Sequence, residues 1–383
     1  MIQIGDFKTT NYMVDNVNSV LKSGRITEGK WTSSFERRFA DIVENKYCIA
    51  VNSGTSALMI AIRAMSPYQD KLNILTTPIS YIATSNAIIN TGNIPMYVDI
   101  DLDTFNMSVE LANEFIDDNC VDIVLPVHLF GFRFPVEKLN EDNVIEDAAQ
   151  ALGTKGIAKG DMTTFSFYVA HTVQAGEMGA VTTNDYKYYL DMKALKSNGR
   201  ICRCKTCTRN ITGCQIMNEH QKIDPRFTHY LIGYNFRTTD LITSIAYSQL
   251  EDIEENVKKR KDNAKFFNDE LKDIDGIHVP KYDKDACLMM YPMIVEDRYK
   301  VVSKLAANGI ESRYIFPCIP LQPAFAYKCS SYTARTFGDS HYYERVLPNA
   351  IKAAEQGLYI PCHQYLSEDD LHKIVNVIKE AIK

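Results

Sequence analysis

The strongest constraint on the fold is an alternation of short apolar runs with amphipathic helical segments between residues 47 and 183. The first run, Tyr47–Val51, precedes a segment in which residues 57, 58, 61, 62 and 65 are apolar, as on one face of a helix. Further strands are expected at Ile74–Thr77, Met96–Ile100, Ile123–His128, Asn143–Glu146, Phe165–Tyr168 and Ala180–Thr183. Strands joined by helices pair in parallel, so we expect an open α/β sheet that binds ligands at the carboxyl ends of its strands.

The chain is long enough for a second, smaller unit. Its 383 residues suit one large α/β domain plus a small one. After a long charged segment that ends near Leu271, the pattern changes to an α+β arrangement, with a strand expected at Met289–Val295 and a final helix at Glu368–Ile382. We therefore predict a large domain of residues 1–255 and a small C-terminal domain of residues 256–383.

Charge and hydropathy exclude several kinds of partner. The chain has 42 Lys and Arg against 48 Asp and Glu, a net charge of −6, whereas a nucleic-acid-binding surface needs a basic face. Charges interrupt every stretch of membrane-spanning length, so no membrane segment is expected. The first residues lack the basic and apolar regions of a signal peptide, and we expect a cytoplasmic protein.

Four of the ten cysteines lie close together in a polar, Lys- and Arg-rich stretch, a predicted insertion at about 200–220. They are Cys202, Cys204, Cys207 and Cys214. A core segment is excluded by the polarity, and closely spaced thiolates are typical of metal or iron–sulfur ligands. Nearby basic residues would lower the thiol pKa values and favour ligation. Redox-active thiols and inert thiols remain alternatives, and the spacing does not name the metal.

Three short motifs carry candidate site residues. The turn Asn52–Thr55 joins a strand to a helix and can either bind an anion or simply cap the helix. Asp147 ends an expected strand, where a carboxylate can pair with a protonated pyridine nitrogen or cap a helix. His171 follows another strand in a loop-like stretch, where a catalytic or a buried structural role is open.

The order of these motifs resembles the DegT/DnrJ/StrS family across nearly the whole chain. The matching stretches are Ser53-Gly-Thr55, Tyr81-Ile-Ala-Thr84, Val98-Asp-Ile-Asp101, Glu146-Asp-Ala-Ala-Gln150, Ser166-Phe167, Gly176-Glu-x-Gly179 and Gly233-Tyr-Asn-Phe-Arg237. The resemblance implies a pyridoxal-phosphate (PLP)-dependent, sugar-modifying enzyme with the aspartate-aminotransferase-type fold (fold type I), a mainly parallel sheet with helices on both faces. It also implies a homodimer with active sites shared between the subunits.

The resemblance also implies a role for each matching residue. Gly54, Thr55 and Ser166 would hold the cofactor phosphate, and Asn235 would reach the phosphate of the neighbouring subunit's cofactor. Tyr81 would stack on the pyridine ring. The ring nitrogen would meet Asp147 and the ring's phenolic oxygen would meet Gln150.

One position departs from the aminotransferase pattern. Family aminotransferases carry a Schiff-base lysine five residues after the Ser-Phe serine, whereas this chain has His171 there and no lysine from Gly160 to Tyr186. The stretch Ser166–His171 resembles the branch of sugar 3-dehydratases, of the CDP-4-keto-6-deoxyglucose 3-dehydratase type. That branch uses pyridoxamine phosphate (PMP) and a histidine base to remove the C3 hydroxyl of a nucleotide-linked 4-keto-6-deoxy sugar.

The branch contains two types, and the cysteines bear on the choice. The ascarylose-pathway type carries a [2Fe–2S] cluster and a reductase partner, and its cysteines begin with Cys-x-Cys, as Cys202 and Cys204 do here. Ala149, however, occupies a position where that type has a cluster cysteine. The alternatives are a cluster-free colitose-type dehydratase that takes its amine from glutamate, and an atypical sugar aminotransferase with a structural metal such as zinc. Either Arg237 or Arg313 could meet the substrate diphosphate.

Overall fold

The computed structural model describes residues 1–202, 204, 214 and 224–383, with the backbone alone at 327, 328, 330, 332, 336 and 337. Of the four clustered cysteines, Cys207 lies outside the described residues. No helix among the described residues is long and apolar enough to cross a membrane.

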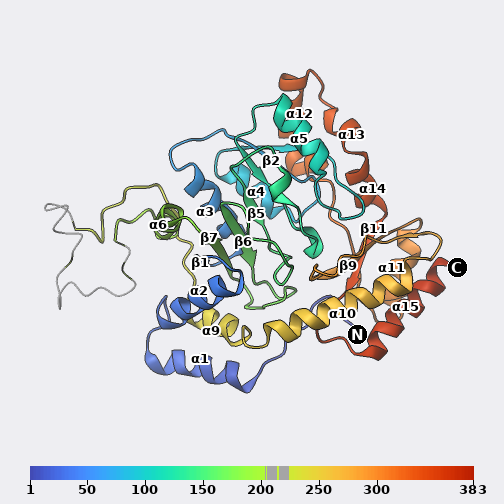
Figure 1. Cartoon of the computed structure of the whole chain (residues 1–383), viewed down its shortest axis with the longest axis horizontal. Helices are drawn as coiled ribbons and strands as arrows, with labels where there is room; N and C mark the ends of the chain where they lie inside the picture. Colours follow the sequence, from blue (N-terminus) through green and yellow to red (C-terminus); the bar gives the residue numbers. More distant parts are fainter. Residues whose placement is uncertain (203, 205–213, 215–223) are drawn as a thin grey trace.

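The central sheet has the strand order β3-β2-β4-β5-β6-β7-β1, because isolated parallel bridges between 124 and 144 and between 127 and 147 join its two halves. Figure 1 shows β1, β7, β6 and β5 near the middle of the molecule. The strands are β1 (Tyr47–Val51), β2 (Asn73–Thr76), β3 (Ile94–Tyr97), β4 (Ile123–Leu125), β5 (Ile145–Asp147), β6 (Met162–Ser166) and β7 (Gly179–Thr183). The strands predicted from the sequence are confirmed; β1 has the predicted bounds, and the bounds of the others differ by at most three residues.

One strand departs from the parallel arrangement. β7 is antiparallel to both β1 and β6. The segment between β6 and β7 contains no helix, whereas a parallel pair needs a long crossover connection. The short connection therefore returns the chain antiparallel, and it leaves a loop with His171 at the carboxyl end of β6.

Helices cover both faces of this sheet (Figure 1). The main covering helices are α1 (Asn11–Ser23), α2 (Lys30–Ile42), α3 (Gly54–Met65), α4 (Ala83–Asn90), α5 (Val109–Asp118), α6 (Tyr186–Leu195) and α9 (Asp240–Ser248). Alternate residues of β1 face opposite sides: Ile49 and Val51 pack with α3, and Cys48 and Ala50 pack with Phe39 of α2. Short 3₁₀ helices lie at Leu129–Gly131, Val136–Lys138 and Ile319–Leu321.

The C-terminal part forms a second, antiparallel sheet in the order β10-β11-β9-β8. Its strands are β8 (Ile277–His278), β9 (Met290–Val295), β10 (Arg313–Tyr314) and β11 (Gly357–Pro361). The surrounding helices are α10 (Ile253–Leu271), α11 (Arg298–Ala307), α12 (Pro323–Phe337), α13 (Tyr342–Val346), α14 (Pro348–Gln356) and α15 (Glu368–Ile382). Helix α10 runs from the first part of the chain along this second part (Figure 1). The domain boundary at residue 255 stays a prediction.

Candidate active site

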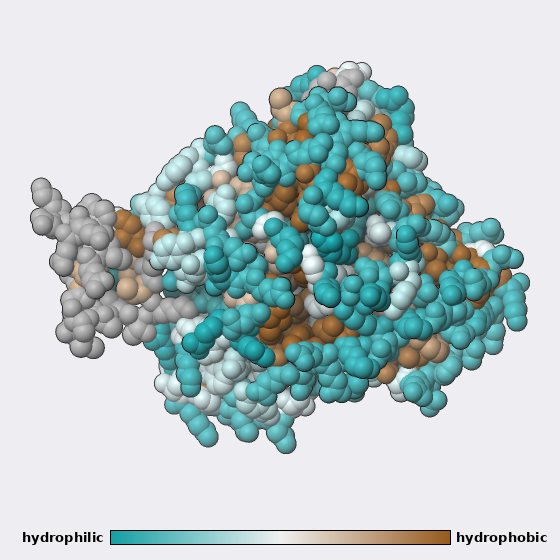
Figure 2. Space-filling model, in the orientation of Figure 1, coloured by the Kyte–Doolittle hydropathy of each residue, from teal (hydrophilic) through white to brown (hydrophobic). Residues whose placement is uncertain are grey.

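A cavity of about 510 Å³ opens at the carboxyl ends of the central strands. It is lined by seven of the eight residues predicted to bind the cofactor or act on it: Gly54, Thr55, Tyr81, Asp147, Gln150, Ser166 and His171. The surrounding surface is mostly hydrophilic, with apolar residues gathered near the middle of the face shown in Figure 2. Residues more than a hundred positions apart thus converge on one pocket, although their individual roles stay predictions.

The start of α3 forms one wall. Ser53 caps the helix, since its hydroxyl accepts a hydrogen bond from the Ser56 amide at 3.1 Å. A Cβ atom on Gly54 would lie 2.8 Å from the Cβ of Ser166, so only glycine lets the helix start approach β6 this closely. The amide groups of the first turn and the hydroxyls of Thr55 and Ser166 suit a phosphate group.

Asp147 is a buried carboxylate with few partners. One oxygen accepts the Thr84 hydroxyl at 2.8 Å and the other accepts the Ala149 amide at 3.1 Å. It forms no ion pair with any residue that the structure describes. Burial raises the pKa of this carboxyl, and the two hydrogen bonds only partly oppose the rise. A protonated pyridine nitrogen would supply the missing positive charge, so this residue fits the cofactor.

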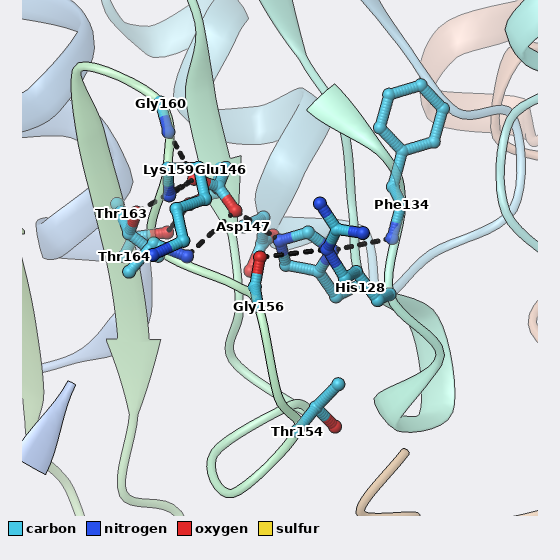
Figure 3. A network of polar contacts seen from close by, with 12 residues as sticks. His128, Phe134, Glu146, Asp147, Thr154, Gly156, Lys159, Gly160, Thr163 and Thr164 are labelled. Atoms are coloured by element: carbon cyan, nitrogen blue, oxygen red, sulfur yellow. Dashed lines mark hydrogen bonds and ion pairs between the residues drawn. The ribbon is translucent and has the colours of Figure 1, made fainter. Parts of the chain in front are cut away.

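The adjacent Glu146 faces a different environment (Figure 3). Its carboxylate lies 2.7 Å from Nε2 of the buried His128 and also accepts backbone amides at 158, 159 and 160. The pKa of Glu146 is lowered: burial raises it, but the bonds from His128 and these amides outweigh burial. Because the Phe134 amide donates to Nδ1 of His128, the hydrogen of that imidazole sits on Nε2 and points at Glu146. The two adjacent carboxylates of β5 therefore lie in different environments: Glu146 has a histidine and three backbone amides as partners, whereas Asp147 has one hydroxyl and one amide.

The side-chain oxygen of Gln150 is already hydrogen-bonded within the protein. Its Oε1 accepts the Phe130 amide at 2.8 Å, so the Nε2 hydrogens remain for a second partner. Gln150 lines the cavity, and an oxygen of a bound ring suits this donor. Tyr81 stands at the opening with 62% of its surface exposed, and its ring lies 6.3 Å from the Phe316 ring.

His171 has a defined tautomer. Its Nδ1 lies 2.8 Å from the carbonyl oxygen of Ser166. A carbonyl only accepts hydrogen bonds, so Nδ1 carries the hydrogen and Nε2 carries a lone pair. The pKa of His171 is lowered from 6.5 to about 4, mainly because burial penalises the charged ring and further because Arg260 is positive. Its contact with Ser166 partly opposes this shift. The ring is therefore neutral at neutral pH.

Among the described residues that line the cavity there is no lysine. The buried Lys196 lies elsewhere, where its Nζ is 2.6 Å from Glu28 and 3.0 Å from the carbonyl oxygen of Ala50. Its two carboxylate neighbours help to raise its pKa despite burial, so it is held as an ammonium ion. No described lysine is thus available to bind an aldehyde in the cavity.

Two predicted groups of residues do not join the cavity. Asn235 is exposed and lies outside the lining, where its backbone bridges to Ser197. Cys202 and Cys214 are partly exposed and Cys204 is exposed. Within the described parts of the chain, no group of three or more His, Cys, Asp or Glu side chains is placed to hold a metal ion. Since Cys207 is outside those parts, the metal site stays a prediction.

Two further residues, Arg313 and Thr84, also line the cavity. Of the two candidate arginines, Arg313 lines the cavity and the exposed Arg237 does not. Arg313 pairs with Glu311 at 2.7 Å. Thr84, which holds Asp147, belongs to a motif noticed in the sequence but had no assigned role. Its position in α4, three residues after Tyr81, was the available signal.

Comparison with known proteins identifies the family. Residues 8–379 match the DegT/DnrJ/EryC1/StrS aminotransferase family. The chain belongs to this family. The GDP-perosamine synthase of Escherichia coli O157:H7 is 29% identical over 82% of this chain and 84% of its own length. The lipopolysaccharide biosynthesis protein RfbH of Salmonella typhimurium is 26% identical over 93% of this chain and 86% of its own.

Solved structures of other proteins have the same fold. The sugar aminotransferase CalS13 from Micromonospora echinospora has a TM-score of 0.83 and 24% identity, and covers 99% of this chain and 100% of its own. The GDP-4-keto-6-deoxymannose-3-dehydratase ColD has a TM-score of 0.82 and 22% identity over the whole of both chains. The predicted fold, that of the fold-type-I PLP enzymes, is confirmed, with β7 as its antiparallel strand.

Proposed function

We propose that this family member is a PMP-dependent 3-dehydratase of a nucleotide-linked 4-keto-6-deoxy sugar. The observation that carries the proposal is the cavity wall itself, which contains His171 and no described lysine. By the sequence resemblance, position 171 is where family aminotransferases would have their Schiff-base lysine. A histidine cannot bind the cofactor aldehyde covalently, but its neutral ring can accept a proton. Family membership supports PLP or PMP as the cofactor.

The cofactor would be held by the chain at three places. The helix start at Gly54 and Thr55, with Ser166, would bind its phosphate. Asp147 would pair with the ring nitrogen, and Tyr81 would cover the ring. When bound, PMP supplies an amine for the C4 ketone of the sugar and an electron-withdrawing ring that lets the C3 hydroxyl leave.

His171 is the proposed base, and Nε2 is the atom that accepts the proton. The contact with Ser166 occupies Nδ1, so the lone pair of Nε2 remains to accept a proton. The anionic phosphates of cofactor and substrate would raise the low pKa of the ring, because nearby negative charge favours the imidazolium form. The base would therefore gain strength when the site is filled.

The names of the relatives support a sugar substrate, but they name different reactions. Most are synthases and transaminases, such as the UDP-2-acetamido-2-deoxy-3-oxo-D-glucuronate aminotransferase of Pseudomonas aeruginosa. ColD is named a 3-dehydratase, and its structure holds GDP-perosamine. The alternative is therefore a sugar aminotransferase of unusual type, which would need an amine donor such as glutamate and would leave nitrogen on the sugar.

The completion of the reaction depends on the cysteines. In the first version of the proposal, a [2Fe–2S] cluster at Cys202, Cys204, Cys207 and Cys214 passes electrons from a reductase partner to the dehydrated sugar. In the second, zinc or inert thiols occupy this stretch and hydrolysis completes the reaction. A homodimer, with Asn235 reaching the partner's cofactor, belongs to both versions, as does an anchor for the substrate diphosphate at Arg313.

Two measurements test the proposal. The protein with added PMP, with and without a chemical reductant such as dithionite, is incubated with a panel of nucleotide-linked 4-keto-6-deoxy sugars, and mass spectrometry follows the product. Loss of the C3 oxygen, absent in H171N, is expected; a product that carries a new amine and forms equally with H171N would overturn the proposal. Iron and sulfide analysis after purification without oxygen separates the two versions, since iron-free protein eliminates the cluster.

A further inference from the structure

Arg260 is a fully buried cation beside the cavity. It lies on α10 with 0% of its surface exposed. Its Nε donates to the Gln364 side chain at 2.7 Å, and its Nη1 donates to the carbonyl oxygen of Met289 at 3.0 Å. Its Nη2 makes a long contact of 3.4 Å with the carbonyl oxygen of His171. One guanidinium thus joins three segments that are far apart in the chain.

Two of these segments form the cavity wall. The loop after β6 carries His171, and the segment before β9 carries Met289, which also lines the cavity. Arginine suits this position because its donors lie in a rigid planar fork that serves several carbonyl groups at once. The position of the His171 backbone is therefore set partly by a residue of α10.

The charge of Arg260 has no counterion within the described parts of the chain. The adjacent thiols do not supply one: burial raises the pKa of Cys362 to about 12 and also raises that of Cys287. A buried charge without a partner is costly, so carbonyl dipoles carry its stabilisation here. Placing a second positive charge on a ring beside it would cost more.

The other ionisable groups near His171 come from several elements of the cavity wall. They are Asp147 of β5, Glu177 of the loop before β7, Arg313 of β10, Tyr359 of β11, Tyr81 before α4 and Tyr168 of the same loop. Both carboxylates would favour a charged ring, yet the pKa of His171 is lowered. Burial, and after it the positive charge of Arg260, lowers this pKa.

We propose that Arg260 is a positioning residue for His171: it holds the carbonyl oxygen of His171 and places its unpaired positive charge beside the loop that carries the imidazole. This inference rests on the proposed function for its catalytic meaning. The coupling of the two residues is a property of the chain without cofactor or substrate, and can be measured separately.

Histidine ring NMR over a pH series tests the coupling in the full-length, cofactor-free chain. The His171 signal is the one that H171N lacks. In R260Q, the pKa of His171 is expected to rise, since the repelling charge is gone. In R260K, which keeps the charge, the pKa is expected to stay low. An unchanged pKa in R260Q would overturn the proposal.

Arg298 offers a matched control. It also donates to backbone carbonyls, those of Ala354 at 2.6 Å and Gly357 at 3.3 Å, but it does not line the cavity. R298Q should leave the pKa of His171 unchanged. If the pKa rose in R298Q as much as in R260Q, the shift would be a general effect of destabilisation, and a specific effect of Arg260 would be refuted. The role of His171 as the base is tested independently. Full activity of H171N would refute the proposed function, but it would not change the pKa measurement that tests the coupling of His171 to Arg260.

The lysine variant decides the outcome if R260Q does not fold. An ammonium group cannot span the acceptors that the guanidinium reaches, so the loop 168–175 should lose its anchor. We expect its backbone amides to exchange with deuterium about tenfold faster in R260K than in the wild type. Exchange as slow as in the wild type would overturn the positioning role.

Discussion

The imidazole Nδ1 of His171 lies 2.8 Å from the carbonyl oxygen of Ser166, five residues earlier in the chain. The same serine places its side chain against the start of α3, where a phosphate group would sit. One residue therefore connects the expected phosphate site with the orientation of the expected base. A residue at position 171 is aimed at the cavity by the backbone that precedes it.

A first prediction concerns the identity of residue 171. H171K should convert the protein to one that binds PLP covalently, because the new amine would stand where family aminotransferases have theirs. Burial would also lower the pKa of the lysine and make it more nucleophilic. Borohydride reduction followed by peptide mass spectrometry should find the cofactor on residue 171. Wild-type protein, which contains Lys196 but no lysine at the cavity, is the control; a label on another residue would show that 171 is misplaced.

A second prediction uses the unpaired charge of Asp147. D147N should weaken cofactor binding roughly 100-fold, because a buried pair with the ring nitrogen is lost. The cofactor-free protein should not lose stability, since asparagine can still accept from Ala149 and its amide can donate to the Thr84 hydroxyl. Titration with PMP measures the first effect and thermal unfolding of cofactor-free protein measures the second. Unchanged PMP affinity would contradict the role of Asp147.

A third prediction concerns Glu146, whose replacement should lower the stability of the cofactor-free protein, unlike D147N. In E146Q, whichever way the amide is turned, its NH₂ group faces donors: His128 and the Ala158 amide on one side, or the amides of 159 and 160 on the other. The expected loss is about 3 kcal/mol in the free energy of unfolding. Urea unfolding measures it, with D147N as the matched control. Equal stability of the two variants would show that the Glu146 network adds nothing.

The pH dependence of this loss has a definite sign. The folded-state pKa of Glu146 is lowered, so its contribution is complete above the unfolded value of about 4.3 and falls as the pH drops through the folded value. The difference between wild type and E146Q should therefore be constant near neutral pH. It should shrink only in acid below the ordinary range of a glutamate.

Much of this arrangement follows from the sequence, because strand periodicity is local. The short apolar runs indicate where the strands lie, and the strand ends indicate where polar residues meet. The antiparallel direction of β7 is different, because it depends on a connection without a helix rather than on the strand itself. The partner of Glu146 also had no local signal, since His128 belongs to a strand end far earlier in the chain.

Arg260 shows the limit of sequence patterns most clearly. Helix α10 is highly charged, and a charged residue in such a helix is expected to face solvent. Its burial arises because segments near 171, 289 and 364 each present an acceptor to the same point in space. Only the tertiary structure brings those acceptors together, so periodicity could not reveal this residue.

A last prediction concerns acid stability. Burial lowers the pKa of His363 from 6.5 to about 4, with Arg260 as a further cause, and it does the same for His171. Nδ1 of His363 accepts the Tyr365 amide at 3.2 Å, a bond that protonation would destroy. Stability from both rings is complete above pH ~6.5 and is lost as the pH falls toward 4, by about 1.4 kcal/mol per pH unit for each ring.

Removing one of the two imidazole rings should therefore make the free energy of unfolding less dependent on pH in the acid range. H363Q should be less stable than the wild type near neutral pH, because its packing is imperfect, but its free energy of unfolding should fall more slowly between pH 6.5 and about 4. H341Q is the control, since His341 is exposed and should leave the slope unchanged. Urea unfolding at a series of pH values measures both. Parallel curves for wild type and H363Q would mean that His363 is protonated alike in the folded and unfolded chains, contrary to its buried contacts.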